Sequence, residues 1–223
     1  MQKKNTLKLL AIYKSKSIMK KIVLLTLVLI SFQFTACKTE KKKEAVVKKE
    51  VKVYPYSLKT AKNSIDWVAY KTTDKLAVKG KFQKVTITKN GEGNTAKEAI
   101  NGTEFSIPVS SIFTADVSRD FKLKKFFFGV MDNTKLLSGT LNISDDTNGT
   151  ASITMNGVTA DLPFTYTLEG KEFKLNATMN LDNWNAQNAV DSLNVACKIL
   201  HAGKDGISKT WSEVTINITS TFK

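Results

Sequence analysis

Few side chains of this 223-residue sequence are of the types that carry out nucleophilic or acid–base chemistry, and the best-spaced pair is Cys197 and His201. These residues are four positions apart, so on a helix they would share one face, where a thiolate and an imidazole can act as a nucleophile and its base. No third residue that would orient the imidazole is indicated. The apolar residues around Cys197 favour the alternative, a buried and unreactive thiol. We therefore predict no catalytic residue and no enzymatic activity.

The small number of histidines and cysteines also limits metal and cofactor chemistry. One His and two Cys, at positions 37 and 197, exclude any site built from several His or from a Cys cluster. The sequence contains neither a glycine-rich nucleotide loop nor a Gly-x-Ser-x-Gly motif around a nucleophile. We predict no metal site and no cofactor.

Anion binding is the other chemistry that the sequence suggests, at Arg119 and Lys122. Both cations lie between Ser118 and Phe126, where we predict a short helix with Ser118 as its cap and an acidic residue in its first turn. The two cations could meet a diphosphate head group. The alternative is that Arg119 pairs with an aspartate and fixes the short helix.

The strong positive charge of the chain does not indicate a nucleic-acid partner. The formal net charge is +14, but residues 1–53 contain 14 Lys and 3 Glu, whereas residues 54–223 contain 20 basic and 17 acidic residues. Arg119 is the single arginine of the whole sequence. Proteins that bind nucleic acids usually use several arginines to contact bases and phosphates. The charge therefore belongs mainly to the N-terminal segment, and we predict no nucleic-acid binding.

The N-terminus has the pattern of an export signal. Met19-Lys20-Lys21 precedes a nine-residue apolar run from Ile22 to Ile30, which is short for a membrane span and long enough for the core of a signal peptide. Phe34-Thr35-Ala36-Cys37 resembles the lipobox of bacterial lipoproteins, which implies cleavage before Cys37 and its acylation, as with palmitate. We expect translation to start at Met19, leaving residues 1–18 untranslated and residues 19–36 as the signal peptide. The alternative is an uncleaved membrane anchor with an ordinary cysteine.

The lipobox resemblance implies that the mature protein lies in the cell envelope, as a periplasmic or outer-membrane lipoprotein held to the membrane by its lipid. Residues 37–53 are rich in Lys and Glu, so they cannot bury enough apolar surface to fold, and we predict a flexible tether. Residues 54–223 are long enough to form one domain with a full core.

Apolar residues alternate with polar ones along most of this domain, which is typical of antiparallel strands with one buried face. The longest stripes are Leu162, Phe164, Tyr166 and Leu168, followed by Phe173, Leu175, Ala177, Met179 and Leu181. Hairpin turns are predicted at Asn90-Gly91, Asn148-Gly149, Asn156-Gly157 and Glu169-Gly170-Lys171. We predict an all-β fold, a lipocalin-like antiparallel β-barrel of about eight strands with the short helix and one amphipathic helix. The amphipathic helix is expected from about Ala186 to His201, with Gly203 placed to stop it.

Three stretches of the domain resemble the YceI-like family, the lipid- or polyisoprenoid-binding proteins of the bacterial envelope. They are Gly80-Lys81-Phe82, the block from Arg119 to Phe128, and the hairpin from Ala151 to Thr159. In the second block Lys122 stands where the family usually has His, and in the third Ala151 replaces a Gly. The resemblance spans roughly residues 57–222 and implies a barrel that holds a long isoprenoid chain.

A barrel that binds a lipid needs a surplus of inward apolar side chains. The residues that we predict to contact a lipidic ligand are Trp67, Phe82, Phe105, Arg119, Lys122, Phe126, Phe127, Phe128 and Phe164. The three adjacent phenylalanines cannot all face one way, so we expect one to close the barrel mouth or to be exposed. The predicted partner is a hydrophobic small molecule, an isoprenoid or another lipid. The alternative is a barrel with a filled core that acts as an adaptor for proteins or glycans at the membrane. The sequence predicts no oligomeric state.

Overall fold

The computed structural model describes residues 52–223. The predictions for the leader 1–36, for lipidation of Cys37 and for the tether up to residue 51 lie outside the described residues. None of the helices between residues 52 and 223 has the length and apolar character needed to cross a membrane. The described strands and buried residues lie between Tyr56 and Phe222, so residues 54–223 contain the complete core of this unit.

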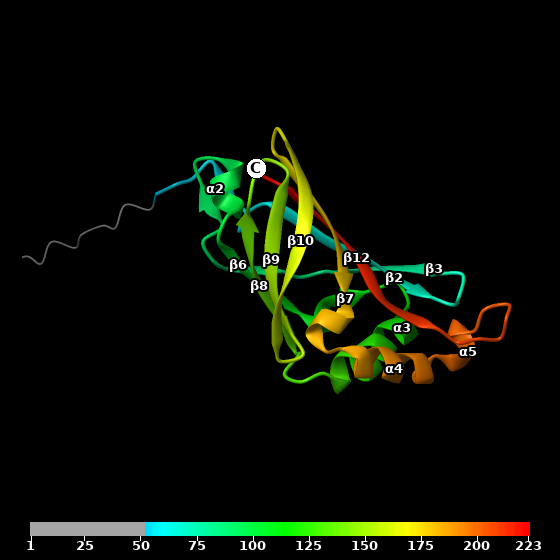
Figure 1. The fold of residues 1–223 in the computed structure, drawn as a ribbon. Helices are drawn as coiled ribbons and strands as arrows, with labels where there is room; N and C mark the ends of the chain where they lie inside the picture. Colours follow the sequence, from blue (N-terminus) through cyan, green and yellow to red (C-terminus); the bar gives the residue numbers. More distant parts are fainter. Residues whose placement is uncertain (1–51) are drawn as a thin grey trace, which may run out of the picture. The chain divides into compact units, whose positions relative to one another are not determined.

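The domain is dominated by one antiparallel sheet of ten strands, which curls around its apolar face (Figure 1). In sheet order the strands are β4 (Thr86–Lys89), β6 (Thr103–Pro108), β8 (Leu136–Ile143), β9 (Asn148–Met155), β10 (Val158–Glu169), β11 (Glu172–Asn180), β12 (Thr210–Thr221), β2 (Lys62–Lys71), β3 (Leu76–Phe82) and β7 (Ile112–Phe113). A separate pair is formed by β1 (Tyr56–Ser57) and β5 (Glu92–Gly93). The antiparallel, lipocalin-like fold that the sequence predicts is confirmed, with more strands than the expected eight.

The predicted stripes form the inner face of the sheet. In β10 the side chains of Leu162, Phe164 and Tyr166 are buried while their neighbours are exposed, because successive residues of a strand point to opposite faces. Strand β11 repeats this alternation with buried residues from Phe173 to Met179. These inward side chains join those of the other strands in a single apolar core.

The ten-stranded sheet is not a closed ring of hydrogen-bonded strands, and we call the break in its ladder between β4 and β7 the seam. Strands β4 and β7 are the two edges of the ten-stranded sheet as described. The chain crosses the seam twice, from β3 to β4 and from β6 to β7. Beside the first crossing the amide of Gln83 donates a hydrogen bond to the carbonyl of Ser111 at 2.9 Å, which continues the pairing of β3 with β7, and the Ser111 hydroxyl lies 3.5 Å from the Lys84 carbonyl.

Short helices cover the two ends of the sheet (Figure 1). The helix at one end is α2 (Ala96–Ile100), which packs against β1, β5 and β8. The group at the other end comprises α3 (Val117–Lys122), the π-helical turn η2 (Leu123–Phe127), the 3₁₀ turn η3 (Phe128–Val130), α4 (Gln187–Ala196) and α5 (Lys198–His201). Two more 3₁₀ turns are η1 (Val109–Ser111) and η4 (Leu181–Trp184). Helix α4 lies on η2 and on β12, so these helices close that end of the apolar interior.

Three local predictions need correction. The cap of α3 is Asp116, whose side chain accepts from the Arg119 amide, and not Ser118. The predicted helix 186–201 is interrupted at Cys197, where the backbone leaves helical geometry (φ −114°, ψ 16°), and it ends at Ala202 before Gly203. The predicted turn at Asn148-Gly149 is wrong because both residues belong to β9, whereas Asn156-Gly157 does form a hairpin, with φ of 52° and 69°.

Candidate functional site

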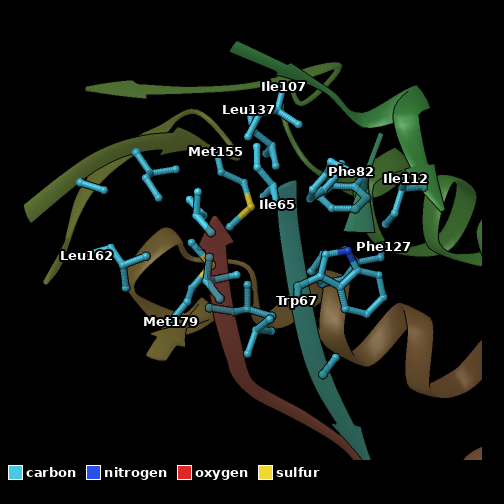
Figure 2. Close-up of a pocket in the computed structure, with 18 of the residues that line it drawn as sticks. Ile65, Trp67, Phe82, Ile107, Ile112, Phe127, Leu137, Met155, Leu162 and Met179 are labelled. Carbon is cyan, nitrogen blue, oxygen red and sulfur yellow. The ribbon is translucent and has the colours of Figure 1, made fainter. Parts of the chain in front are cut away.

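The interior of the curled sheet contains a cavity of about 150 Å³, here called the central cavity (Figure 2). Its walls come from nine strands and from η2, η3, η4 and α4 at the helical end. Apart from Thr210, every side chain in its lining is aliphatic, thioether or aromatic. A water molecule needs two or more polar partners to occupy such a space, so the central cavity favours apolar occupants.

Six of the predicted ligand-contacting residues line the central cavity: Trp67, Phe82, Phe105, Phe127, Phe128 and Phe164. They come from five separate segments of the chain, and Figure 2 shows Trp67, Phe82 and Phe127 on the same side of the cavity. The rings of Phe127 and Phe128 pack edge to face with centroids 4.8 Å apart, and Phe128 also meets Phe82 at 6.3 Å.

Phe126 is the member of the aromatic triplet that does not line the central cavity. It is partly buried and packs edge to face against the exposed Phe121 at 6.4 Å. The ammonium group of Lys125 lies over both rings, at 5.5 Å from Phe121 and 5.2 Å from Phe126. The structure therefore separates Phe126 from its two neighbours, which the sequence pattern alone did not distinguish.

Two glycines make room for the aromatic side chains of the lining. A Cβ atom at Gly80 would lie 2.1 Å from Cζ2 of Trp67, the residue opposite it in the β2–β3 ladder. A Cβ atom at Gly149 would lie 2.3 Å from Cζ of Phe164, its partner across β9 and β10. Each ring thus lies flat on the neighbouring strand, and any larger residue there would push it into the cavity.

A second cavity of about 170 Å³ lies at the helical end of the sheet. Charged side chains form part of its lining, so we call it the polar cavity. Trp67, Ala69, Leu123, Leu193 and Thr210 line both cavities and form the partition between them. Arg119 and Lys122 line the polar cavity, so the structure places these two predicted residues apart from the aromatic ones.

The cations of the polar cavity have weak or exposed partners. Nη2 of Arg119 lies 3.5 Å from Oδ2 of Asp116, which is the ion pair that the sequence suggested as an alternative to ligand binding. Nζ of Lys122 donates to the Ser118 hydroxyl at 3.0 Å. Lys71, which the sequence analysis did not single out, donates from Nζ to a backbone carbonyl of α5 at 2.9 Å. An exposed ion pair contributes little free energy, so Arg119 can exchange its partner easily.

Cys197 and His201 also line the polar cavity, but they do not have the properties of a nucleophilic pair. Burial raises the pKa of the Cys197 thiol, so the thiolate is disfavoured. Burial, with Lys71 and Lys122 nearby, lowers the pKa of His201 to about 4. Nδ1 of His201 is 2.7 Å from the Thr210 hydroxyl, so the imidazole is held by β12.

A third, smaller cavity of about 50 Å³ follows the central one toward the α2 end. The two share five lining residues: Ile65, Phe105, Ile107, Leu141 and Ile218. The three cavities therefore form a row along the inner face of the sheet, with the charged groups at one end. Among residues 52–223, no three His, Cys, Asp or Glu side chains gather where they could hold a metal ion.

Sequence reasoning missed Lys71, His201 and the helix residues Val190 and Leu193 as parts of these cavities. Lys71 could have been found as the charged residue that ends the apolar stripe of β2. The helical spacing did suggest that Leu193 faces the sheet, and it is buried. Nothing in the spacing placed α3 and α5 on the same cavity, because that depends on the path of the whole chain.

This chain is similar to one protein family and to several solved structures. The family model described as the YceI-like domain matches residues 56–222. No curated protein matches the chain. A polyisoprenoid binding domain from Saccharophagus degradans aligns with a TM-score of 0.54 at 10% identity, over 77% of this chain and 99% of that one.

Two further solved structures are similar over a smaller part of this chain. BcnA from Burkholderia cenocepacia aligns with a TM-score of 0.45 at 14% identity, covering 71% of this chain and 94% of its own. The YCEI protein of Campylobacter jejuni aligns with a TM-score of 0.45 at 17% identity, covering 66% and 85%.

Proposed function

This chain belongs to the YceI-like domain family, and from that premise we propose that it is a non-catalytic protein that binds a lipidic molecule inside its curled sheet. The observation that carries the proposal is the central cavity, whose lining contains a single hydroxyl among apolar side chains. Each methylene group that moves from water into such a space contributes about 0.8 kcal/mol. A chain of isoprene units is the first candidate, because a domain of the same fold is described as polyisoprenoid binding.

The size of the cavities limits how such a chain could be held. A rigid cavity of about 150 Å³ holds a molecule of roughly six carbon atoms, which is close to one isoprene unit. A longer chain needs the three cavities to merge. They are separated by side chains that line two cavities at once, such as Leu123 and Phe105. Rotation of these side chains would join the row of cavities into one channel.

The small volume also favours a second candidate function. A barrel whose interior is mostly filled by its own side chains needs no ligand, and it would then act through its surface as an adaptor for a protein or glycan partner. In that case the central cavity is a packing defect, of the kind that natural cores contain in small numbers.

Native mass spectrometry of residues 54–223, purified from bacterial membranes and cytosol, separates these two functions. The lipid-binding function predicts a co-purifying molecule of uniform mass, or uptake of an added isoprenoid such as farnesol. The variant Leu162→Trp places a larger side chain in the lining of the central cavity, so it should abolish uptake of the added isoprenoid. A ligand-free mass that stays unchanged with excess isoprenoid would refute the lipid-binding function.

We also propose that the mature protein is an envelope lipoprotein, anchored through Cys37 after cleavage of the signal peptide. The support is the lipobox-like sequence from Phe34 to Cys37 behind a short apolar run. One acyl chain gives marginal membrane binding, whereas two or three give stable anchoring. In fractionated cells, Cys37→Ser should therefore move the protein from the membrane to the soluble fraction after release of its signal. Unchanged membrane retention of this variant would contradict lipidation.

A further inference from the structure

The exposed apolar side chains of the domain gather at its helical end. Eleven large hydrophobic residues are exposed in the described part of the chain, and eight of them lie in residues 113–130 and 187–209. The first segment contains α3, η2 and η3, and the second contains α4, α5 and the loop that leads to β12 (Figure 1). We call the exposed residues of these two segments the helical-end surface. Such a concentration of apolar side chains on a surface is typical of a contact site.

Helix α3 turns one apolar face toward solvent. Val117 and Phe121 are four positions apart, so they share a helix face, and both are exposed. Arg119 and Lys122, on the other side of the helix, line the polar cavity. The apolar pair therefore faces away from the cavity and packs on no other element. The ammonium group of Lys125 lies 5.5 Å from the Phe121 ring, which holds a cation beside this aromatic tip.

The segment from α4 to β12 repeats this arrangement. Val195 and Ile199, again four positions apart, are exposed, whereas Cys197 between them is buried and lines the polar cavity. Ile207 is exposed in the loop that follows. Leu200 lines the polar cavity and is still 56% exposed, so it lies at the rim of that cavity.

The helical end also carries the whole net charge of the domain. The two segments contain seven basic and four acidic residues, so the remainder of residues 54–223 contains thirteen of each sign. Among the ion pairs of residues 52–223, none involves a lysine of these segments. These lysines are Lys122, Lys124, Lys125, Lys198, Lys204 and Lys209. The helical-end surface therefore has a positive potential and attracts an anionic partner.

Lysines placed among exposed apolar side chains favour a lipid surface over a protein. The cores of protein–protein interfaces are depleted in lysine. Helices that lie on membranes combine apolar tips with lysines on the flanks, because the tips enter the head-group region and the ammonium groups meet lipid phosphates.

We propose that the helical-end surface docks on an anionic phospholipid bilayer. Phe121 and Ile199 enter the head-group region, and the neighbouring lysines contact lipid phosphates. The docked domain has the rim of the polar cavity, marked by Leu200, against the bilayer. This contact uses the outer surface of the domain, so it requires neither an occupied cavity nor a lipid on Cys37.

Cosedimentation of residues 52–223 with vesicles tests the docking, since this part of the chain contains the complete core and lacks Cys37. We expect binding to vesicles of phosphatidylglycerol and phosphatidylethanolamine to be at least roughly tenfold tighter than to phosphatidylcholine vesicles, because each lysine near an anionic surface contributes to binding. Added salt should weaken the binding.

Two pairs of variants assign the binding to the helical end. Ile199→Ser should weaken it by roughly tenfold, whereas Val53→Ser should not; Ile199 and Val53 are 89% and 87% exposed, and Val53 precedes β1 at the α2 end. Lys198→Gln should weaken it several-fold, whereas Lys62→Gln, an exposed lysine at the start of β2, should have little effect. All four side chains are exposed, so the variants should keep their fold.

Selective loss of vesicle binding in Ile199→Ser and Lys198→Gln supports the proposal. Absence of binding to anionic vesicles, or equal losses within each pair of variants, would overturn it. A domain that binds no vesicles but changes from dimer to monomer on Ile199→Ser, as measured by analytical ultracentrifugation, would assign this surface to contact between two copies of the chain. The proposed ligand binding inside the sheet is tested separately, by native mass spectrometry without vesicles.

Discussion

Acidification should destabilise this domain through one residue, His201. It is the single histidine of the sequence, so no other imidazole titrates between pH 4 and 6.5. Burial, with Lys71 and Lys122 close by, lowers the pKa of its side chain from 6.5 to about 4. The unfolded chain takes up this proton below pH 6.5, whereas the folded domain stays neutral down to about pH 4. Protons therefore favour the unfolded state within this window, and stability falls as the pH falls.

The magnitude follows from the two pKa values. One proton changes the free energy of unfolding by up to about 1.4 kcal/mol per pH unit. Across the window from pH 6.5 to about 4, the loss is therefore at most about 3 kcal/mol. Below pH 4 both states are protonated and this contribution does not grow further. With a urea dependence of about 2 kcal/mol per molar, the unfolding midpoint should shift by up to roughly 1.5 M.

Urea unfolding at several pH values, followed by tryptophan fluorescence, measures this loss. His201→Gln is the comparison, because it removes the titrating group and keeps polar atoms that can meet the Thr210 hydroxyl. The carboxylates titrate in both proteins, so the difference between the two curves isolates the imidazole. Parallel curves for the two proteins between pH 6.5 and 4, or an imidazole that titrates near pH 6.5 by NMR, would refute this account.

Three other predictions concern packing and the thiol. Gly149→Ala should lower the free energy of unfolding by about 1–3 kcal/mol, because its Cβ would overlap the ring of Phe164. Gly170→Ala meets no neighbouring atom but has a positive φ of 58°, so it should cost only about 1 kcal/mol for the left-handed backbone; urea unfolding compares the two. Trp184→Ala should cost about 3–5 kcal/mol in the same assay, since this side chain is fully buried. Cys197 in residues 54–223 should react with Ellman's reagent at pH 7 only after unfolding, because burial protects the thiol and raises its pKa, and rapid reaction of the folded domain would contradict this.

The alternation of apolar and polar residues along the strands was the part of the fold that could be predicted from the sequence. The stripes in β10 and β11 have a period of two over many residues, so their burial follows from strand geometry. The turn at Asn148-Gly149 was predicted wrongly because the preceding Asp145 makes the turn instead. Its carboxylate accepts hydrogen bonds from the amides of Thr147 and Asn148, both at 2.8 Å, which lowers the pKa of Asp145 to about 2. Gly149 lies within strand β9 instead of in a turn, and a glycine is needed there because the ring of Phe164 occupies the space of a Cβ atom.

The candidate site was less predictable, because it depends on contacts between distant segments. The residue types around Arg119 suggested an anion site, but its place beside His201 follows from how α3 and α5 meet on the sheet. Phe126 and Phe127 lie in the π-helical turn at Leu123–Phe127 and Phe128 begins the following 3₁₀ turn, so the directions of the three side chains do not follow one helical period. The sequence contains no periodic pattern that predicts this π-helical turn.

The seam between β4 and β7 determines which part of the barrel can yield when its contents grow. Elsewhere around the ring, long ladders such as the nine pairs between β11 and β12 resist any change in circumference. At the seam no ladder joins β4 to β7, and the two edges are linked by the chain itself, which crosses from β3 to β4 and from β6 to β7. A wider occupant can therefore be accommodated by spreading these edges without breaking a ladder. The sheet is an open curl rather than a closed barrel. The free energy needed to move its two edges apart therefore limits the width of the molecules that it can hold.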